Sequence, residues 1–202
     1  MGGVRGVVFD VGNVLFSWDP RFLYERLIDD DQALDAFLRD VVTHEWHFQH
    51  DAGRPFAETS AELIARYPDQ RGLIEVWGPR FNESLSGPVP GMIELVEDLD
   101  EGGVPLFAIT NFSDEFWVPF RRHQPVFDRF RDIVVSGTER LVKPDRAIYD
   151  LALRRFGMPA EELIFIDDRP ENVTGAEAVG MRGHLFRDAP TLRSELQTLG
   201  LF

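Results

Sequence analysis

Short apolar runs that alternate with amphipathic stretches dominate the pattern of the chain beyond residue 87. The apolar runs span residues 104–109, 133–135, 163–166 and 184–186. One more apolar run, Val7 to Phe9, lies near the start of the sequence and has the length and composition of a buried strand. Strands that alternate with helices of this length favour parallel pairing through right-handed crossovers. The pattern therefore predicts an α/β core with a doubly wound parallel sheet.

The stretch between residues 17 and 86 has a different pattern, because its apolar residues recur at helical spacing and no convincing strand interrupts them. One of its apolar stripes consists of Phe22, Leu23, Leu27 and Ile28. A turn-rich linker, residues 86–91, follows the stretch. We therefore predict that residues 1–16 and 87–202 form the core and that residues 17–86 form an all-helical insert.

Charge and composition exclude several classes of function. The 202 residues carry a formal net charge of −14, which leaves no broad basic surface for nucleic acid. An anionic substrate would therefore have to meet a metal ion or a few placed Lys and Arg side chains. The absence of cysteine excludes disulfides, thiolate metal sites and a cysteine nucleophile. Few residues precede the first strand and no apolar run reaches membrane-spanning length, so we expect no signal peptide, no membrane partner and a cytoplasmic location.

Polar residues follow three of the predicted strands. They are Asp10 after the first strand, Thr110 and Asn111 after another, and Asp167 and Asp168 after a third. Each group alone could simply cap a turn or the next helix. The carboxyl ends of parallel strands, however, meet at one edge of the sheet, where ligands bind in open α/β folds. We therefore expect these side chains to lie close together.

The adjacent carboxylates indicate a cation site. Asp167 and Asp168 repel each other and destabilise the fold unless a cation lies beside them. With Asp10 they offer hard oxygen ligands, which suit Mg²⁺ better than a softer transition metal. Lys143, which precedes Pro144, is by itself most simply a solvated surface lysine. Together, a metal, a carboxylate and a lysine can hold a phosphoryl group, because the cations offset the phosphate charge.

The order of these residues resembles the four motifs of the haloacid dehalogenase-like superfamily, in particular its phosphatases with a helical cap. The motif residues are Asp10, Thr110, Lys143-Pro144 and Asp167-Asp168. The most specific pieces are residues 143–149 and 166–176. The resemblance covers essentially the whole chain. It implies a Rossmann-like core, with the helical insert acting as a cap that closes over the substrate.

The resemblance implies a role for each motif residue. Asp10 would be the nucleophile, which attacks phosphorus and forms an aspartyl-phosphate. Thr110 and Asn111 would bind the transferring phosphoryl group of a small phosphorylated substrate. Lys143 would neutralise that group and position Asp10. These roles describe a Mg²⁺-dependent phosphomonoester hydrolase.

The resemblance also implies the magnesium ligands. Asp168 would bind Mg²⁺ directly, and Asp167 would bind it directly or through water. Asp10 would supply a further carboxylate, and the backbone carbonyl of Gly12 would complete the protein ligands. Asn172 would steady the loop that carries the acidic pair.

One position departs from the phosphatases of this superfamily. They usually carry a second aspartate two residues after the nucleophile, which protonates the leaving alcohol and then deprotonates the attacking water. Here that position is Gly12, and loss of a general acid typically costs about 10²–10⁴-fold in rate. Water or a group of the insert would then carry the proton, and a titratable cluster in the insert offers candidates, unless it is simply a solvated or packed helix end. The cluster consists of Glu45, His47, His50 and Asp51.

Three interpretations of Gly12 follow. The run Asp-Val-Gly-Asn-Val-Leu that begins at Asp10 resembles a phosphatase subgroup with bacterial enzymes that act on glucose 1-phosphate, which suggests a sugar phosphate as substrate. Alternatively, Asp10 attacks carbon in a 2-haloacid dehalogenase, although dehalogenases generally lack an acidic pair such as Asp167-Asp168. The third interpretation is a catalytically weak protein that binds a phosphorylated ligand. Phosphate release that requires Mg²⁺ would favour the first interpretation, and halide release the second.

Overall fold

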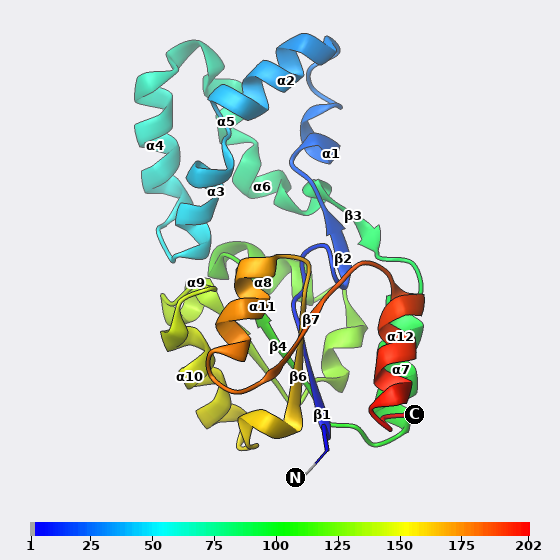
Figure 1. The fold of residues 1–202 in the computed structure, drawn as a ribbon. Helices are drawn as coiled ribbons and strands as arrows, with labels where there is room; N and C mark the ends of the chain where they lie inside the picture. Colours follow the sequence, from blue (N-terminus) through cyan, green and yellow to red (C-terminus); the bar gives the residue numbers. More distant parts are fainter. Residues whose placement is uncertain (1–2) are drawn as a thin grey trace.

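A five-stranded parallel sheet lies at the centre of the larger part of the molecule (Figure 1). The structure is a computed structural model that describes residues 3–202. The strands follow the order β5-β4-β1-β6-β7, with bounds β1 Gly6–Phe9, β4 Leu106–Thr110, β5 Asp132–Val135, β6 Leu163–Asp167 and β7 Arg182–Leu185. Val7 in the central strand lies opposite Leu106 on one side and Ile164 on the other, in parallel register. The predicted doubly wound α/β core is confirmed.

Helices cover both faces of this sheet. They are α7 Met92–Glu101, α8 Asp114–Arg121, α9 Ser136–Glu139, α10 Arg146–Phe156, α11 Pro170–Glu177 and α12 Ala189–Thr198, with the 3₁₀ turns η3 Pro125–Arg129 and η4 Ala160–Glu162. Val7 belongs to a buried cluster with Leu95 of α7 and Leu192 of α12, whereas its neighbour Val8 belongs to a second cluster with Ile148 of α10. Because helices cover both faces, the central strands β1, β4 and β6 are continuous buried runs, whereas the edge strands β5 and β7 are partly exposed.

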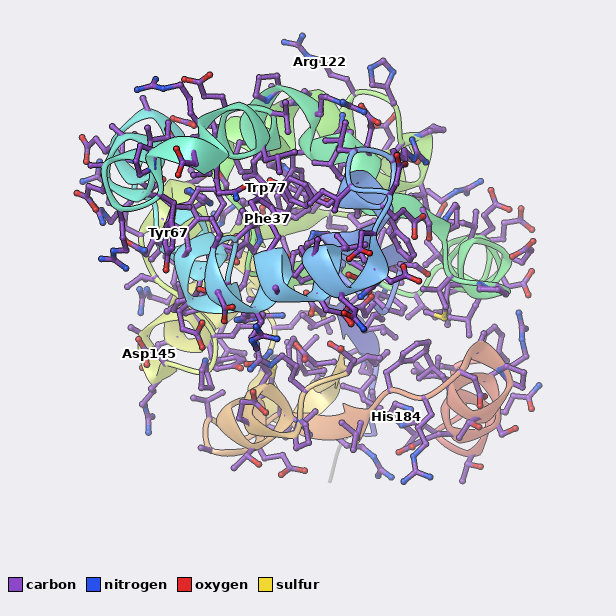
Figure 2. All side chains as sticks on the ribbon, turned by 90° about the horizontal axis from the view of Figure 1, so that it is seen from above. Phe37, Tyr67, Trp77, Arg122, Asp145 and His184 are labelled. Carbon is purple, nitrogen blue, oxygen red and sulfur yellow. The ribbon has the colours of Figure 1, made fainter. Side chains whose placement is uncertain are left out.

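Residues 21–84 form a separate helical segment above the carboxyl ends of the strands (Figure 1). Its elements are α1 Arg21–Tyr24, α2 Asp31–Asp40, α3 His44–Asp51, α4 Phe56–Arg66, η1 Pro68–Gln70, α5 Arg71–Glu75, α6 Trp77–Arg80 and η2 Phe81–Ser84. Phe37 and Trp77 lie among these helices (Figure 2), and the ring of Tyr24 stacks on that of Trp77 with centroids 5.8 Å apart. None of the helices in residues 3–202 has both the length and the apolar character needed to cross a membrane.

A two-stranded antiparallel ribbon connects the helical segment to the core. In this ribbon β2, Phe16–Trp18, pairs with β3, Leu85–Pro88. The prediction that no strand occurs between residues 17 and 86 was therefore wrong at both ends of that stretch. The pairing joins residues that are distant in the sequence, and β3 reads Leu-Ser-Gly-Pro, which has poor strand propensity. The predicted domain boundaries, between residues 16 and 17 and between residues 86 and 87, fall inside these strands, and the division stays a prediction. Residues 1 and 2 of the predicted core lie outside the described part of the chain.

Candidate active site

The residues predicted from the sequence meet where β1, β4 and β6 end, beneath the helical segment. Asp10 directly follows β1, Thr110 ends β4, and Asp167 ends β6. A cavity of about 320 Å³ opens at this edge of the sheet. Of the motif residues, those on its wall are Asp10, Gly12, Asn111, Lys143 and Asp168. Thr110 and Asp167 are fully buried and do not line the cavity.

Lys143 joins two of the acidic residues. Its side chain is 1% exposed, and its Nζ lies 2.8 Å from Asp10 Oδ1 and 2.7 Å from Asp167 Oδ2. Burial opposes the positive charge, but the carboxylates of Asp10 and Asp167 outweigh this effect and raise the pKa of Lys143 above its usual value. Lys143 is therefore a permanent cation beside Asp10 and not a solvated surface lysine.

Three carboxyl groups cluster around the single positive charge of Lys143. Oxygen atoms of Asp10, Asp167 and Asp168 lie within 4.8 Å of one another. Burial is the main reason that the pKa of Asp10 rises to about 7; Lys143 opposes this rise, and Asp167 adds to it. Burial, followed by the charge of Asp167, also raises the pKa of Asp168. One lysine thus does not balance the cluster, and its hard oxygen donors fit a divalent cation such as Mg²⁺.

Hydrogen bonds fix Asp167 in place. Asn172 Nδ2 donates to both carboxylate oxygens of Asp167, at 3.0 and 3.1 Å. The backbone N–H of Arg169 donates to Asp167 Oδ1 at 2.9 Å. Tyr149 in turn donates its hydroxyl to the backbone carbonyl of Asn172 at 2.8 Å. These bonds use much of the acceptor capacity of Asp167, so Asp168, on the cavity wall, is better placed to bind a metal ion directly.

Thr110 and Asn111 make different contacts at the end of β4. Asn111 Nδ2 donates to the backbone carbonyl of Lys143 at 3.0 Å, and its Oδ1 accepts the Lys143 backbone N–H at 2.8 Å. Asn111 therefore holds the segment that carries Lys143, while its role in binding a phosphoryl group stays a prediction. The buried Thr110 hydroxyl has no hydrogen-bond partner within residues 3–202. A phosphoryl oxygen at this strand end would satisfy that hydroxyl.

Gly12 lies on the cavity wall two residues beyond Asp10. A Cβ added at Gly12 would meet no atom of the described chain within 4 Å, so the position has room for a side chain that the sequence does not supply. The next residue, Asn13, has a φ of 56°, a conformation that asparagine tolerates better than most residues. Its Oδ1 accepts the backbone N–H of Trp18 at 2.9 Å. This bond stabilises the turn that leads from β1 to β2.

The helical segment supplies the opposite wall of the cavity. Of the four titratable residues predicted there as alternatives, His47 and Asp51 line the cavity, whereas Glu45 and His50 do not. Glu45 is exposed to solvent. His50 Nε2 forms a hydrogen bond of 2.6 Å with Thr59 Oγ1 inside the helical segment. The sequence could not separate these four residues, because all of them belong to α3.

Apolar side chains that no motif identified form much of the remaining wall. They are Trp18, Phe48, Phe81, Leu85 and Phe112. The Trp18 ring stacks on His47, with centroids 4.9 Å apart. Arg169 also lines the cavity and adds a positive charge. Aromatic residues recur through the insert, but this pattern fits a packed interior equally well, as the buried Trp46 shows.

Comparison with known sequences places the chain among enzymes. A protein-family model described as haloacid dehalogenase-like hydrolase matches residues 4–180. The sesquiterpene phosphatase astK of Aspergillus oryzae is 27% identical, over 96% of this chain and 96% of its own length. A phosphoglycolate phosphatase of Yersinia pseudotuberculosis is 29% identical, over 88% of this chain and 78% of its own length.

Solved structures share the architecture. A family enzyme of Bacteroides thetaiotaomicron, determined as a magnesium complex, has a TM-score of 0.74 at 19% identity and covers 97% of this chain and 99% of its own. An L-2-haloacid dehalogenase has a TM-score of 0.65 at 21% identity and covers 98% of this chain and 100% of its own. At these identities the likeness shows the fold alone.

Proposed function

The chain belongs to the haloacid dehalogenase-like hydrolases, and from that premise we propose that it is a Mg²⁺-dependent phosphomonoester hydrolase that works through an aspartyl-phosphate at Asp10. The observation that supports this proposal best is the placement of Lys143 between Asp10 and Asp167, with Asp168 beside them. Transfer of a phosphoryl group to an aspartate needs a carboxylate nucleophile and positive charge around the phosphoryl oxygens. The site offers both on the wall of one cavity.

The acidic cluster would hold the metal ion. Of the three acids in this cluster, Asp168 and Asp10 lie on the cavity wall, and Gly12, whose backbone carbonyl would be a further ligand, lines the same wall two residues after Asp10. Asp167 already pairs with Lys143 and accepts a hydrogen bond from Asn172, so we propose that it binds the metal ion either directly or through water. A bound Mg²⁺ would offset the charge of the phosphoryl oxygens and of the three acids.

The side chains of the core divide the remaining tasks. Asp10 attacks phosphorus, the ester P–O bond breaks, and the alcohol leaves with a proton. Lys143 orients Asp10 through its 2.8 Å contact and keeps its charge throughout. The Thr110 hydroxyl, which is buried at the end of β4 and has no partner within residues 3–202, would donate to a phosphoryl oxygen that reaches this strand end. Water then attacks phosphorus, and its attack returns Asp10 to a free carboxylate.

We propose that residues 17–86 act as a cap over this reaction. The cavity lies between side chains of the core and side chains of the helical segment, such as Phe48 and Phe81. Closure of an apolar wall over the substrate excludes water and strengthens the electrostatic interactions inside.

The apolar wall favours an ester whose alcohol part is apolar. Trp18, Phe48 and Phe81 can bury such a group, as pockets for small molecules commonly do. The relative named as a sesquiterpene phosphatase supports this substrate class, because a sesquiterpene is a hydrocarbon skeleton. We therefore propose a small phosphorylated metabolite with an apolar body ahead of the sugar phosphate that the motif resemblance suggests.

A phosphate-release screen tests the proposed function. The panel consists of prenyl monophosphates, sugar phosphates and phosphoglycolate, each assayed with Mg²⁺ and with EDTA. We expect release only with Mg²⁺ and the highest kcat/KM for the prenyl esters. Release that is insensitive to EDTA, or the absence of release from the whole panel, would count against a metal-dependent phosphatase.

A 2-haloacid dehalogenase is the less well supported alternative. The dehalogenases of this superfamily generally lack an acidic pair, whereas Asp167 and Asp168 lie beside Asp10 here. Halide release from 2-chloropropionate in the presence of EDTA would favour the dehalogenase.

A further inference from the structure

The proposed reaction needs a proton carrier, which the core does not supply at Gly12. The leaving alcohol must gain a proton, and the attacking water must lose one. Gly12 has no side chain, and Lys143 is held between two carboxylates. Another side chain of the cavity wall, or a water molecule, must therefore carry the proton.

Asp51 is a buried carboxyl group on the opposite side of the same cavity. It is the last residue of α3 and lines the cavity together with Asp10 and Lys143. The residue is only 6% exposed, and its Oδ1 has no hydrogen-bond partner anywhere in the described chain. An unpaired carboxyl oxygen that is this deeply buried costs stability, and such groups commonly have a functional explanation.

The end of α3 is tied to the core next to the reaction site. Ser136 Oγ donates to the backbone carbonyl of Asp51 at 2.6 Å and accepts the backbone N–H of Phe112 at 2.9 Å. One hydroxyl thus links Asp51 to the segment that follows Thr110. This link fixes the distance between Asp51 and the strand ends that carry the motif residues.

His47, another titratable residue of α3 on the cavity wall, is less suited to the task. His47 lies between the rings of Trp18 and Phe81, at centroid distances of 4.9 and 5.7 Å. Its Nε2 is 3.6 Å from Asp51 Oδ2, one turn further along the same helix. Burial lowers the pKa of His47 well below its usual value, which leaves the imidazole neutral and a poor acid.

We infer that Asp51 is the general acid and base of the proposed hydrolase, in place of the side chain that Gly12 lacks. The inference rests on the proposed function. In the first step Asp10 forms a bond to phosphorus, and the electron pair of the breaking P–O bond goes to the leaving oxygen, which takes the proton of Asp51. In the second step water bonds to phosphorus and passes a proton to the Asp51 carboxylate, while the electron pair of the breaking bond returns to Asp10.

The protonation state of Asp51 agrees with this role. Burial, followed by the charge of Asp10, raises the pKa of Asp51 to about 8, although Lys143 and a backbone hydrogen bond from Ser113 oppose the rise. The carboxyl group therefore carries a proton at neutral pH and can donate it in the first step.

Leaving groups of different basicity test the inference. An alkoxide needs a proton in order to depart, whereas p-nitrophenolate departs without one. We expect Asp51→Asn to slow the first turnover of an alkyl phosphate by about 10²–10⁴-fold, as loss of a general acid does. The first turnover of p-nitrophenyl phosphate, measured by rapid mixing, should change less than about threefold. Its later turnovers should be slow, because the attacking water then lacks a base.

Three matched variants complete the design. Asp51→Glu keeps a carboxyl group and should restore much of the alkyl phosphate rate. His47→Gln removes the neighbouring imidazole and should leave the ratio of alkyl to aryl rates unchanged. Asp10→Asn should abolish the p-nitrophenolate burst, because it removes the nucleophile itself.

The possible failures are distinguishable. If the wild-type protein shows no burst and no phosphate release, the proposed function fails. If the wild type is active but Asp51→Asn slows both substrates equally in the first turnover, or slows neither, the role of Asp51 is wrong. A change in the alkyl-to-aryl ratio caused by His47→Gln and not by Asp51→Asn would assign the proton transfer to His47 instead.

Discussion

At the scale of single residues, the charged groups at the sheet edge have separate tasks. Lys143 pairs with Asp10 and Asp167, and Asn172 holds Asp167 through two hydrogen bonds. Asp168 lines the cavity and forms none of the ion pairs found within residues 3–202. Its removal should therefore affect metal binding while the pairs of Lys143 stay intact.

Asp168→Ala is predicted to raise the Mg²⁺ concentration for half-maximal activity by about tenfold or more, because the affinity of a hard-oxygen site depends on its number of carboxylates. A titration of phosphate release against Mg²⁺ measures the effect. Glu171→Gln is the matched control, since it removes an exposed carboxylate that pairs only with Arg169 among the described residues. Equal titration curves for the wild type and Asp168→Ala would remove Asp168 from the metal site.

At the scale of elements, Asn111, directly after β4, holds the segment before α10 that carries Lys143. Two hydrogen bonds between the Asn111 side chain and the Lys143 backbone form this support, one donated by the Asn111 amide and one accepted by its oxygen. A misplaced catalytic group can cost about 10²-fold in rate. We therefore predict that Asn111→Ala lowers kcat by about 10–10²-fold with a smaller change in KM, as measured by steady-state kinetics. A raised KM with an unchanged kcat would instead assign Asn111 to substrate binding.

The central core strands were predictable because β1, β4 and β6 are buried along their whole length. The apolar run at 163–166, for example, became β6, Leu163–Asp167, with helices on either side. The ribbon of β2 and β3 was not predictable, since three or four residues carry too little pattern and their pairing partners are distant in the sequence. The short helix α9, Ser136–Glu139, escaped prediction for the same reason.

The motif residues of the site were predictable because each one adjoins a recognisable strand or helix. Asp10 and Asp167, for example, stand at the ends of two neighbouring strands. The opposite wall was not predictable in this way. Asp51 lines the cavity, and the end of α3 that carries it is held to the core by Ser136, a contact between residues far apart in the sequence. Periodicity cannot show such a contact.

At the scale of the whole molecule, buried carboxyl groups make stability depend on pH. Folding raises the pKa of Asp10 to about 7 and that of Asp51 to about 8, in both cases mainly through burial, from ordinary values of 3.8. Between the unfolded and folded pKa values the folded state binds more protons, so the free energy of unfolding falls as pH rises. Folding lowers the pKa of His47 and of His50, so these two groups make the free energy of unfolding rise with pH. Their effect is confined to pH values below their ordinary pKa of 6.5.

The raised carboxyl pKa values therefore dominate the pH dependence above the histidine range. We predict that the free energy of unfolding in EDTA falls by about 1 kcal/mol per pH unit between about pH 7 and 8. Urea denaturation at several pH values measures this slope. Asp51→Asn should remove most of it, because asparagine does not titrate. Stability that rises with pH over this interval would contradict the raised pKa of Asp51.

The claim that Asp10 captures phosphorus is tested most directly by trapping the intermediate. A reaction of the protein with p-nitrophenyl phosphate and Mg²⁺ is quenched rapidly in acid, and the peptide that contains Asp10 is analysed by mass spectrometry. We predict that Asp10 gains the mass of one phosphoryl group, and that Asp10→Asn, a nearly isosteric change, abolishes both adduct and turnover with little change in Tm. A phosphoryl group trapped on another residue would contradict this mechanism. So would turnover that persists in Asp10→Asn after deamidation back to aspartate has been excluded.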